Sequence, residues 1–157
     1  MPYQVAVCGP QDCTDVDAEH ARRVGRLLAE HGVIVLCGGG DGVMGAAAEG
    51  ARSADGLVVG ILPGKSRMGA NEHLSTAIAT GIGQARNLAV VGSGDAVIAI
   101  GGEWGTLSEI GFARRLGRPV IALRSWQLRN QAGSELGIAE AESAGEAVAA
   151  ALEAAAR

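Results

Sequence analysis

Short runs of apolar, mostly β-branched residues alternate along the chain with longer segments in which apolar residues recur every three or four positions. The short runs predict strands that are buried on both faces, and the longer segments predict helices with one apolar side. The predicted strands are residues 3–8, 33–37, 57–62, 96–100 and 119–123, with a shorter one at 76–80. The predicted helices are residues 16–31, 43–53, 84–91 and 105–116.

The end of the chain has a less regular pattern. Residues 124–142 are polar and predict an irregular segment. Ser143 and Glu146 have the spacing of a capping box, so a final alanine-rich helix is expected to follow and to end near residue 155. Strands separated by helices favour a parallel sheet. We therefore expect residues 1–157 to form a single α/β domain that binds a nucleotide: a doubly wound, Rossmann-like parallel sheet with helices on both faces.

Composition excludes several classes of protein. The formal net charge is −4 and no basic stripe is present, which argues against a nucleic-acid partner. The chain has neither the pattern of a signal peptide nor an apolar run long enough to span a membrane, so we expect a cytoplasmic protein without a membrane partner. The cysteines form no CxxC pair and the histidines share no ligand spacing with an acid or a cysteine. We therefore expect free cysteines and no metal site.

A glycine-rich stretch, GGGDGVMG at residues 38–45, joins a predicted strand to a predicted helix. Glycine lets the backbone approach an anion closely, while free amides at the start of a helix point toward it. An NAD site would also need an acidic residue at the end of the next strand, which instead runs into Pro-Gly-Lys. The residues predicted to bind a phosphate group in this turn are Gly39, Gly40, Gly42, Met44 and Gly45.

A second turn of the same kind, GGEWGTLSE at residues 101–109, follows the strand at 96–100. Here Gly102, Gly105 and Thr106 are the predicted phosphate-binding residues. Carboxyl ends of parallel strands meet at one edge of a sheet, so both turns are expected at the edge where ligands bind. Two tight connections without a ligand remain the alternative. Trp104 is a candidate either for stacking on a base or for packing in a core or interface.

These two turns resemble those of the LOG-like family, Rossmann-type proteins often mislabelled lysine decarboxylases. The first turn is similar to the family's early glycine-rich turn. The second is similar to its PGGxGTxxE motif at Gly102, Gly105, Thr106 and Glu109, whereas Gly101 replaces the proline and Glu103 replaces the second glycine. The order of elements agrees with the family over roughly residues 3–123.

The resemblance implies a nucleoside 5′-monophosphate phosphoribohydrolase, which cleaves the N-glycosidic bond to release base and ribose 5-phosphate and requires no cofactor. The family's catalytic pair corresponds to Arg86 and Glu109, although Asn87 stands where the family has lysine. Glycosidic hydrolysis ordinarily uses two carboxyl groups, and Asp95 and Glu103 are the candidates for the second. A decarboxylase using pyridoxal phosphate is not expected, because the chain's single lysine lies in a polar loop.

The alternative is a non-catalytic carrier that binds molybdenum cofactor or another phosphorylated ligand. The segments GGEWGTLSEI and TGIGQARN resemble a short, divergent branch related to molybdenum-cofactor carrier proteins. The departures at Gly101, Glu103 and Asn87 favour the carrier, and the retention of Arg86 and Glu109 favours the hydrolase. A nucleotide-sensing domain without turnover is a third possibility. The resemblance also implies a homodimer or homotetramer.

Overall fold

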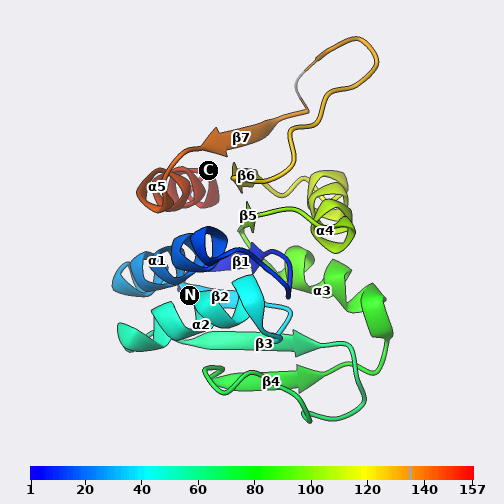
Figure 1. Cartoon of the computed structure of the whole chain (residues 1–157). Coiled ribbons are helices and arrows are strands. Elements are labelled where there is room, and N and C mark those ends of the chain that lie inside the picture. Colours follow the sequence, from blue (N-terminus) through cyan, green and yellow to red (C-terminus); the bar gives the residue numbers. More distant parts are fainter. Residues whose placement is uncertain (135) are drawn as a thin grey trace.

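Seven parallel strands form one sheet in the order β4-β3-β2-β1-β5-β6-β7 (Figure 1). The computed structural model describes residues 1–134 and 136–157. After β1 the chain adds strands outward on one side, and it then returns to build the other side from β5. The strands are β1 (Gln4–Cys8), β2 (Ile34–Cys37), β3 (Val58–Leu62), β4 (Thr76–Ala79), β5 (Ala96–Ile100), β6 (Val120–Leu123) and β7 (Ile138–Ala141). This order confirms the predicted doubly wound fold.

Helices cover both faces of the sheet. In Figure 1 the arrows of β4 and β7 point in different directions, because the twist between neighbouring strands accumulates across the sheet. Helices α1, α2 and α5 pack on one face, and α3 and α4 pack on the other. The helices are α1 (Asp15–Glu30), α2 (Gly42–Ser53), α3 (Arg86–Ser93), α4 (Trp104–Arg115) and α5 (Ala144–Ala155), with a short 3-10 turn at Gly83–Ala85.

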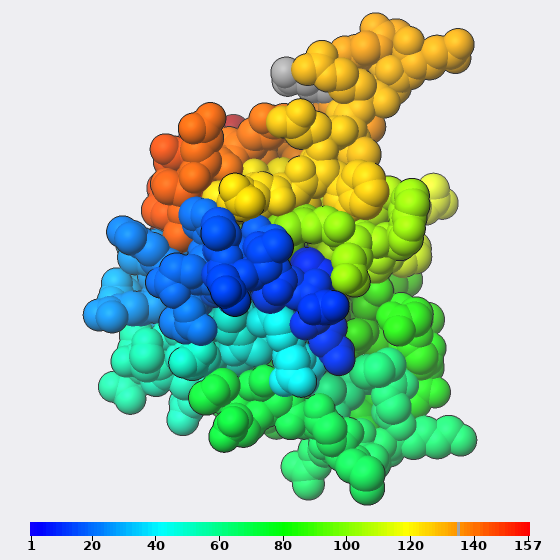
Figure 2. Space-filling view, in the orientation of Figure 1, coloured from blue at the N-terminus to red at the C-terminus, as the bar shows by residue number. Residues whose placement is uncertain are grey.

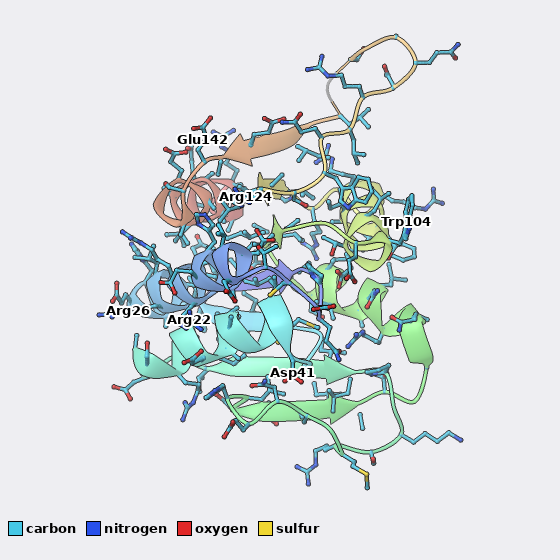
Figure 3. All side chains as sticks on the ribbon, viewed as in Figure 1. Arg22, Arg26, Asp41, Trp104, Arg124 and Glu142 are labelled. Carbon is cyan, nitrogen blue, oxygen red and sulfur yellow. The ribbon has the colours of Figure 1, made fainter. Side chains whose placement is uncertain are left out.

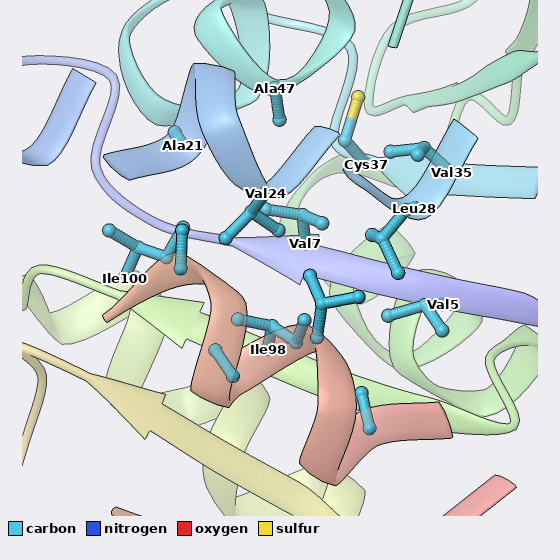
Figure 4. Close-up of a cluster of buried hydrophobic side chains, with 14 of the residues drawn as sticks. Val5, Val7, Ala21, Val24, Leu28, Val35, Cys37, Ala47, Ile98 and Ile100 are labelled. Atoms are coloured by element: carbon cyan, nitrogen blue, oxygen red, sulfur yellow. The ribbon is translucent and has the colours of Figure 1, made fainter. Parts of the chain in front are cut away.

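Alternate residues of the central strands fill two cores. Val5, Val7, Ile98 and Ile100 point toward α1, α2 and α5, where they are fully buried (Figure 4). Their neighbours in the same strands point to the other face, because successive side chains of a strand alternate. Both faces of β1 and β5 are therefore apolar, and these strands appear in the sequence as unbroken apolar runs.

The prediction that residues 124–142 are irregular is wrong in one part. Ile138–Ala141 forms β7, which pairs in parallel with β6 at the edge of the sheet. Its pattern is weak because only Ala141 is buried, so this strand lacks the apolar run that marks the others. Figure 2 shows the preceding orange segment projecting from the body of the molecule.

Two glycines allow α1 and α2 to pack unusually closely. A Cβ atom at Gly25 would lie 1.9 Å from the carbonyl oxygen of Ala47, and one at Gly50 would lie 1.8 Å from that of Arg22. Each distance is far inside van der Waals contact, so the two backbones touch where the glycines stand. Among the helices that the structure describes, none has the length and apolarity needed to cross a membrane.

Candidate functional site

A cavity of about 430 Å³ lies beyond the carboxyl ends of β1 and β5. These are the neighbouring strands at which the strand order reverses, the usual place for a ligand in a doubly wound sheet. The wall is built from the loop after β1, the beginning of α2, the start of α3 and the first turns of α4. The lining residues are Gly9, Pro10, Gln11, Met44, Gln84, Arg86, Asn87, Glu103, Gly105, Thr106, Ser108 and Glu109.

The first turn of α4 supplies hydrogen-bond donors to this cavity. Glu103 is the N-cap residue, but its side chain makes no capping bond to the helix amides. Thr106 is 2% exposed, and its hydroxyl has no hydrogen-bond partner within residues 1–134 and 136–157. A buried hydroxyl left without a partner costs about 1–3 kcal/mol, which an oxygen of a bound ligand would offset. Helix N-termini attract anions, so this turn is suited to a phosphate group.

The first glycine-rich turn is organised differently, because two of its backbone amides already donate hydrogen bonds to carbonyl oxygens of the protein. The Val43 amide donates to the carbonyl oxygen of Pro10 at 3.0 Å, and the Gly45 amide donates to that of Asp41 at 3.4 Å. Gly42 has a φ of +61°, and a Cβ atom there would lie 2.2 Å from the carbonyl oxygen of Gln11. The glycine is therefore needed for the close approach of the loop after β1.

The structure brings together part of the predicted site. Five predicted residues line the cavity: Met44, Arg86, Gly105, Thr106 and Glu109. The remaining predicted residues, Gly39, Gly40, Gly42, Gly45 and Gly102, are not among its lining residues. A Cβ atom at Gly102 would lie 3.1 Å from the indole nitrogen of Trp126, so that ring covers the glycine.

Arg86 joins the ends of two strands beside the cavity. Its Nη1 atom donates to the carbonyl oxygens of Gly38, at the end of β2, and of Ile61 in β3, the latter at 2.7 Å. Its Nε atom donates to the side-chain oxygen of Asn87 at 2.7 Å. Asn87, which departs from the family's lysine, thus helps to orient the guanidinium group.

Glu109 is the buried acid of the cavity, with 7% exposure. Burial raises the pKa of its carboxyl group from 4.5 to about 7, although the charge of Arg86 and a hydrogen bond with the Cys8 thiol both lower it. No cation of the described residues forms an ion pair with Glu109. The protonated form of Glu109, which is able to donate a hydrogen bond, is therefore favoured far more than for an exposed glutamate.

The two candidates for a second carboxyl group differ in position. Asp95 comes just before β5, at the amino ends of the strands, whereas the cavity lies at their carboxyl ends. Its Oδ2 atom accepts a hydrogen bond from the Gln4 amide at 2.9 Å. It does not line the cavity. Glu103 does, but its side chain is exposed at the N-terminus of α4. The interior of the cavity thus has one carboxyl group, that of Glu109.

Sequence reasoning missed the residues that follow β1. Gly9, Pro10 and Gln11 form one side of the cavity. A signal was available, because the end of the first strand also lies at the ligand-binding edge of a parallel sheet. Across the part of the chain that the structure describes, no group of three or more histidine, cysteine or acidic side chains is placed to hold a metal ion.

The family of the chain follows from a match over most of its length. A model of the SLOG cluster4 family matches residues 2–151. The chain belongs to this family. An uncharacterized protein from Archaeoglobus fulgidus is 45% identical over 121 residues, which cover 77% of this chain and 80% of that protein.

Two solved structures closely match this SLOG cluster4 protein. The molybdenum cofactor binding protein of Rippkaea orientalis is 34% identical, with a TM-score of 0.89 over 98% of this chain and 97% of that one. The molybdenum cofactor carrier protein of Chlamydomonas reinhardtii is 28% identical, with a TM-score of 0.85 over the whole of both chains. These matches confirm the predicted resemblance to a LOG-like branch related to molybdenum-cofactor carriers.

Proposed function

We propose that this SLOG cluster4 protein is a non-catalytic carrier of a phosphorylated ligand, and that molybdenum cofactor, a phosphorylated pterin, is its cargo. The two solved relatives named for this cofactor support the choice of ligand. The orphaned hydroxyl of Thr106 and the uncapped start of α4 fit a phosphate group. A cavity of about 430 Å³ is large enough for a small heterocyclic ligand.

The observation that carries this proposal is the arrangement of Arg86 and Glu109. Hydrolysis of a glycosidic bond ordinarily needs one carboxyl group as acid and another as base or nucleophile. Here Glu109 is the one interior carboxyl group, and Nη1 and Nε of Arg86 are bonded to protein oxygens. The interior of the cavity thus lacks the second carboxyl group that this hydrolysis ordinarily uses, while Arg86 supplies a positive charge beside it.

Each group then has a binding role. Thr106 and the amides of the first turn of α4 hold the phosphate group. Protonated Glu109 donates a hydrogen bond to the ligand, and Arg86 contributes positive charge. Gly39, Gly40, Gly42 and Gly45 shape the loops that frame the cavity, which is the role we assign to them in place of direct contact.

Replacing Thr106 by valine is expected to weaken binding of GMP and of ribose 5-phosphate by about 10-fold, the loss of one hydrogen bond to a charged group. GMP is the probe because guanine and pterin share an amino-oxo-pyrimidine ring. Titration calorimetry measures both affinities. The free energy of unfolding without ligand is not expected to fall, because the lost hydroxyl had no partner.

Thr76→Val is the matched control, since Thr76 is exposed on the edge strand β4. It is expected to leave both affinities unchanged. Protein purified from a bacterium that makes molybdenum cofactor supplies a second readout. Wild-type protein is expected to retain more pterin than Thr106→Val, measured after oxidation of the released pterin to its fluorescent form. Equal binding by both variants would contradict the proposed phosphate site.

Incubation with AMP separates the carrier from the phosphoribohydrolase. A carrier is expected to release no free adenine over hours, quantified by chromatography. Adenine release that disappears in Glu109→Gln would overturn the proposal and establish the hydrolase.

We also infer from the family resemblance that the protein is a homodimer or homotetramer. Apolar side chains are exposed on α3 and α4, namely Leu88 of α3, Phe112 of α4 and Leu116 at the C-cap of α4. Light scattering is expected to give a mass that is two or four times 15.8 kDa. A monomeric mass would exclude this assembly.

A further inference from the structure

Asn87 is the buried amide side chain of the cavity. The amides of Gln11 and Gln84 also line it, but both residues are exposed, so water can satisfy their polar groups. Asn87 is 6% exposed and lies in the first turn of α3. A polar side chain buried to this extent ordinarily has hydrogen-bond partners in the protein or in a ligand.

The contact with Arg86 fixes the orientation of the Asn87 amide. A guanidinium nitrogen donates hydrogen bonds and accepts none, so the atom that lies 2.7 Å from Nε of Arg86 must be the amide oxygen. The amide nitrogen of Asn87 carries two N–H donors and makes no hydrogen bond with residues 1–134 and 136–157. Because Asn87 lines the cavity, this free donor is available to a bound ligand.

Asn87 and the proposed phosphate site belong to the same small cavity. Figure 3 shows α4, marked at its first residue by the exposed side chain of Trp104, beside α3, and the two helices pack against each other. The first turn of α3 carries Asn87, and that of α4 carries Thr106. A volume of about 430 Å³ is that of a sphere about 9 Å across, which a small heterocycle with a phosphate group occupies. A ligand that fills the cavity therefore contacts both residues.

The two donors suit different parts of such a ligand. The hydroxyl of Thr106 lies at the start of a helix, where the free amides favour an anion. The amide of Asn87 is uncharged, so it is suited to an uncharged acceptor such as a ring oxo group.

We infer that Asn87 is a specificity-determining residue, whose amide nitrogen donates a hydrogen bond to an oxo group on the ring of the ligand and thereby selects oxo-substituted over amino-substituted heterocycles. The inference rests on the proposed function, because it takes a phosphorylated heterocycle in this cavity as given. An amino group at the same ring position is itself a donor, so the two N–H groups would face each other unpaired. A site built to bond one group rejects the analogue that leaves its buried polar groups without partners.

Two nucleotides test this selection, because IMP and AMP share their sugar and phosphate groups and differ chiefly at position 6, which is oxo in IMP and amino in AMP. Wild-type protein is expected to bind IMP about 10-fold more tightly than AMP, the effect of one hydrogen bond in a partly buried site. Asn87→Asp keeps an oxygen for Nε of Arg86 and replaces the free donor by an acceptor. This variant is expected to prefer AMP, as measured by titration calorimetry.

The ratio of the two affinities is the readout, because the added charge of Asn87→Asp weakens both of them through the shared phosphate group. Gln131→Glu is the matched control. Gln131 is exposed and does not line the cavity, so the same added charge is expected to leave both affinities unchanged.

The outcomes separate the two hypotheses. Equal affinities of wild-type protein for IMP and AMP would overturn the role of Asn87 without any variant, and so would an Asn87→Asp protein that still prefers IMP. Binding of ribose 5-phosphate without a preference between the nucleotides refutes the role of Asn87 alone. If wild-type protein binds neither the nucleotides nor ribose 5-phosphate, the proposed function itself fails.

Discussion

Replacing Gly25 by alanine is expected to lower the free energy of unfolding by about 3 kcal/mol. The added methyl group would lie 1.9 Å from the carbonyl oxygen of Ala47, a backbone atom that cannot rotate away. Relief requires α1 and α2 to separate, which opens the core that Val24 and Ala47 share (Figure 4). Denaturation with urea, followed by circular dichroism, measures the change.

Gly111→Ala is the control for this experiment. Gly111 lies within α4, and no atom lies within 4 Å of the position that a Cβ atom would take. Alanine there is expected to raise the free energy of unfolding by about 0.5–1 kcal/mol, the usual gain over glycine in a helix. A Gly25→Ala protein as stable as wild type would mean that α1 and α2 are not in backbone contact.

Glu109→Gln is expected to stabilise the ligand-free protein by about 3 kcal/mol at pH 8 and to change its stability little at pH 4. Folding raises the pKa of this carboxyl group from 4.5 to about 7, chiefly by burial. Between these values the folded state binds more protons than the unfolded state, so the free energy of unfolding falls as pH rises. Above pH 7 the whole penalty is present, because a buried charge must then be maintained.

Urea denaturation at several pH values between 4 and 8 measures this effect. Glu72→Gln is the control, because Glu72 is exposed in the loop between β3 and β4. The stability of this variant is expected to follow that of wild type at every pH. If Glu109→Gln also follows wild type, the carboxyl group is ionised at neutral pH and cannot donate a hydrogen bond to the ligand.

The sequence was sufficient to predict most of the sheet, because the central strands are buried on both faces. Val5, Val7, Ile98 and Ile100 belong to runs that could not be placed at a surface without exposing large apolar areas. The edge strand β7 was not predicted, because it has only one buried residue and therefore no continuous apolar run. Close contact of α1 and α2 at Gly25 was also not foreseen, because a glycine inside a helix does not reveal which backbone lies against it.

The candidate site was predicted in part, and the missing part depended on tertiary structure. Thr106 and Glu109 belong to a motif whose spacing fixes them on the first turns of one helix. The amide of Val43 donates a hydrogen bond to the carbonyl oxygen of Pro10, a residue distant in the chain. The sequence could not reveal that this amide already has a partner. The hydrogen bonds from Arg86 to the carbonyl oxygens of Gly38 and Ile61 could not be predicted either, because both partners are distant from Arg86 in the chain.

The bonds of Arg86 have a consequence for how ligand binding at the proposed site and the stability of the sheet depend on each other. One side chain connects the start of α3 to the ends of β2 and β3, and β3 in turn carries the edge strand β4. Edge strands are the parts of a sheet that open most readily in local fluctuations. Arg86 would have to leave the cavity wall before β3 could separate. A ligand bound in the cavity would therefore oppose that fluctuation, and ligand binding and cohesion of the sheet's outer half would be cooperative.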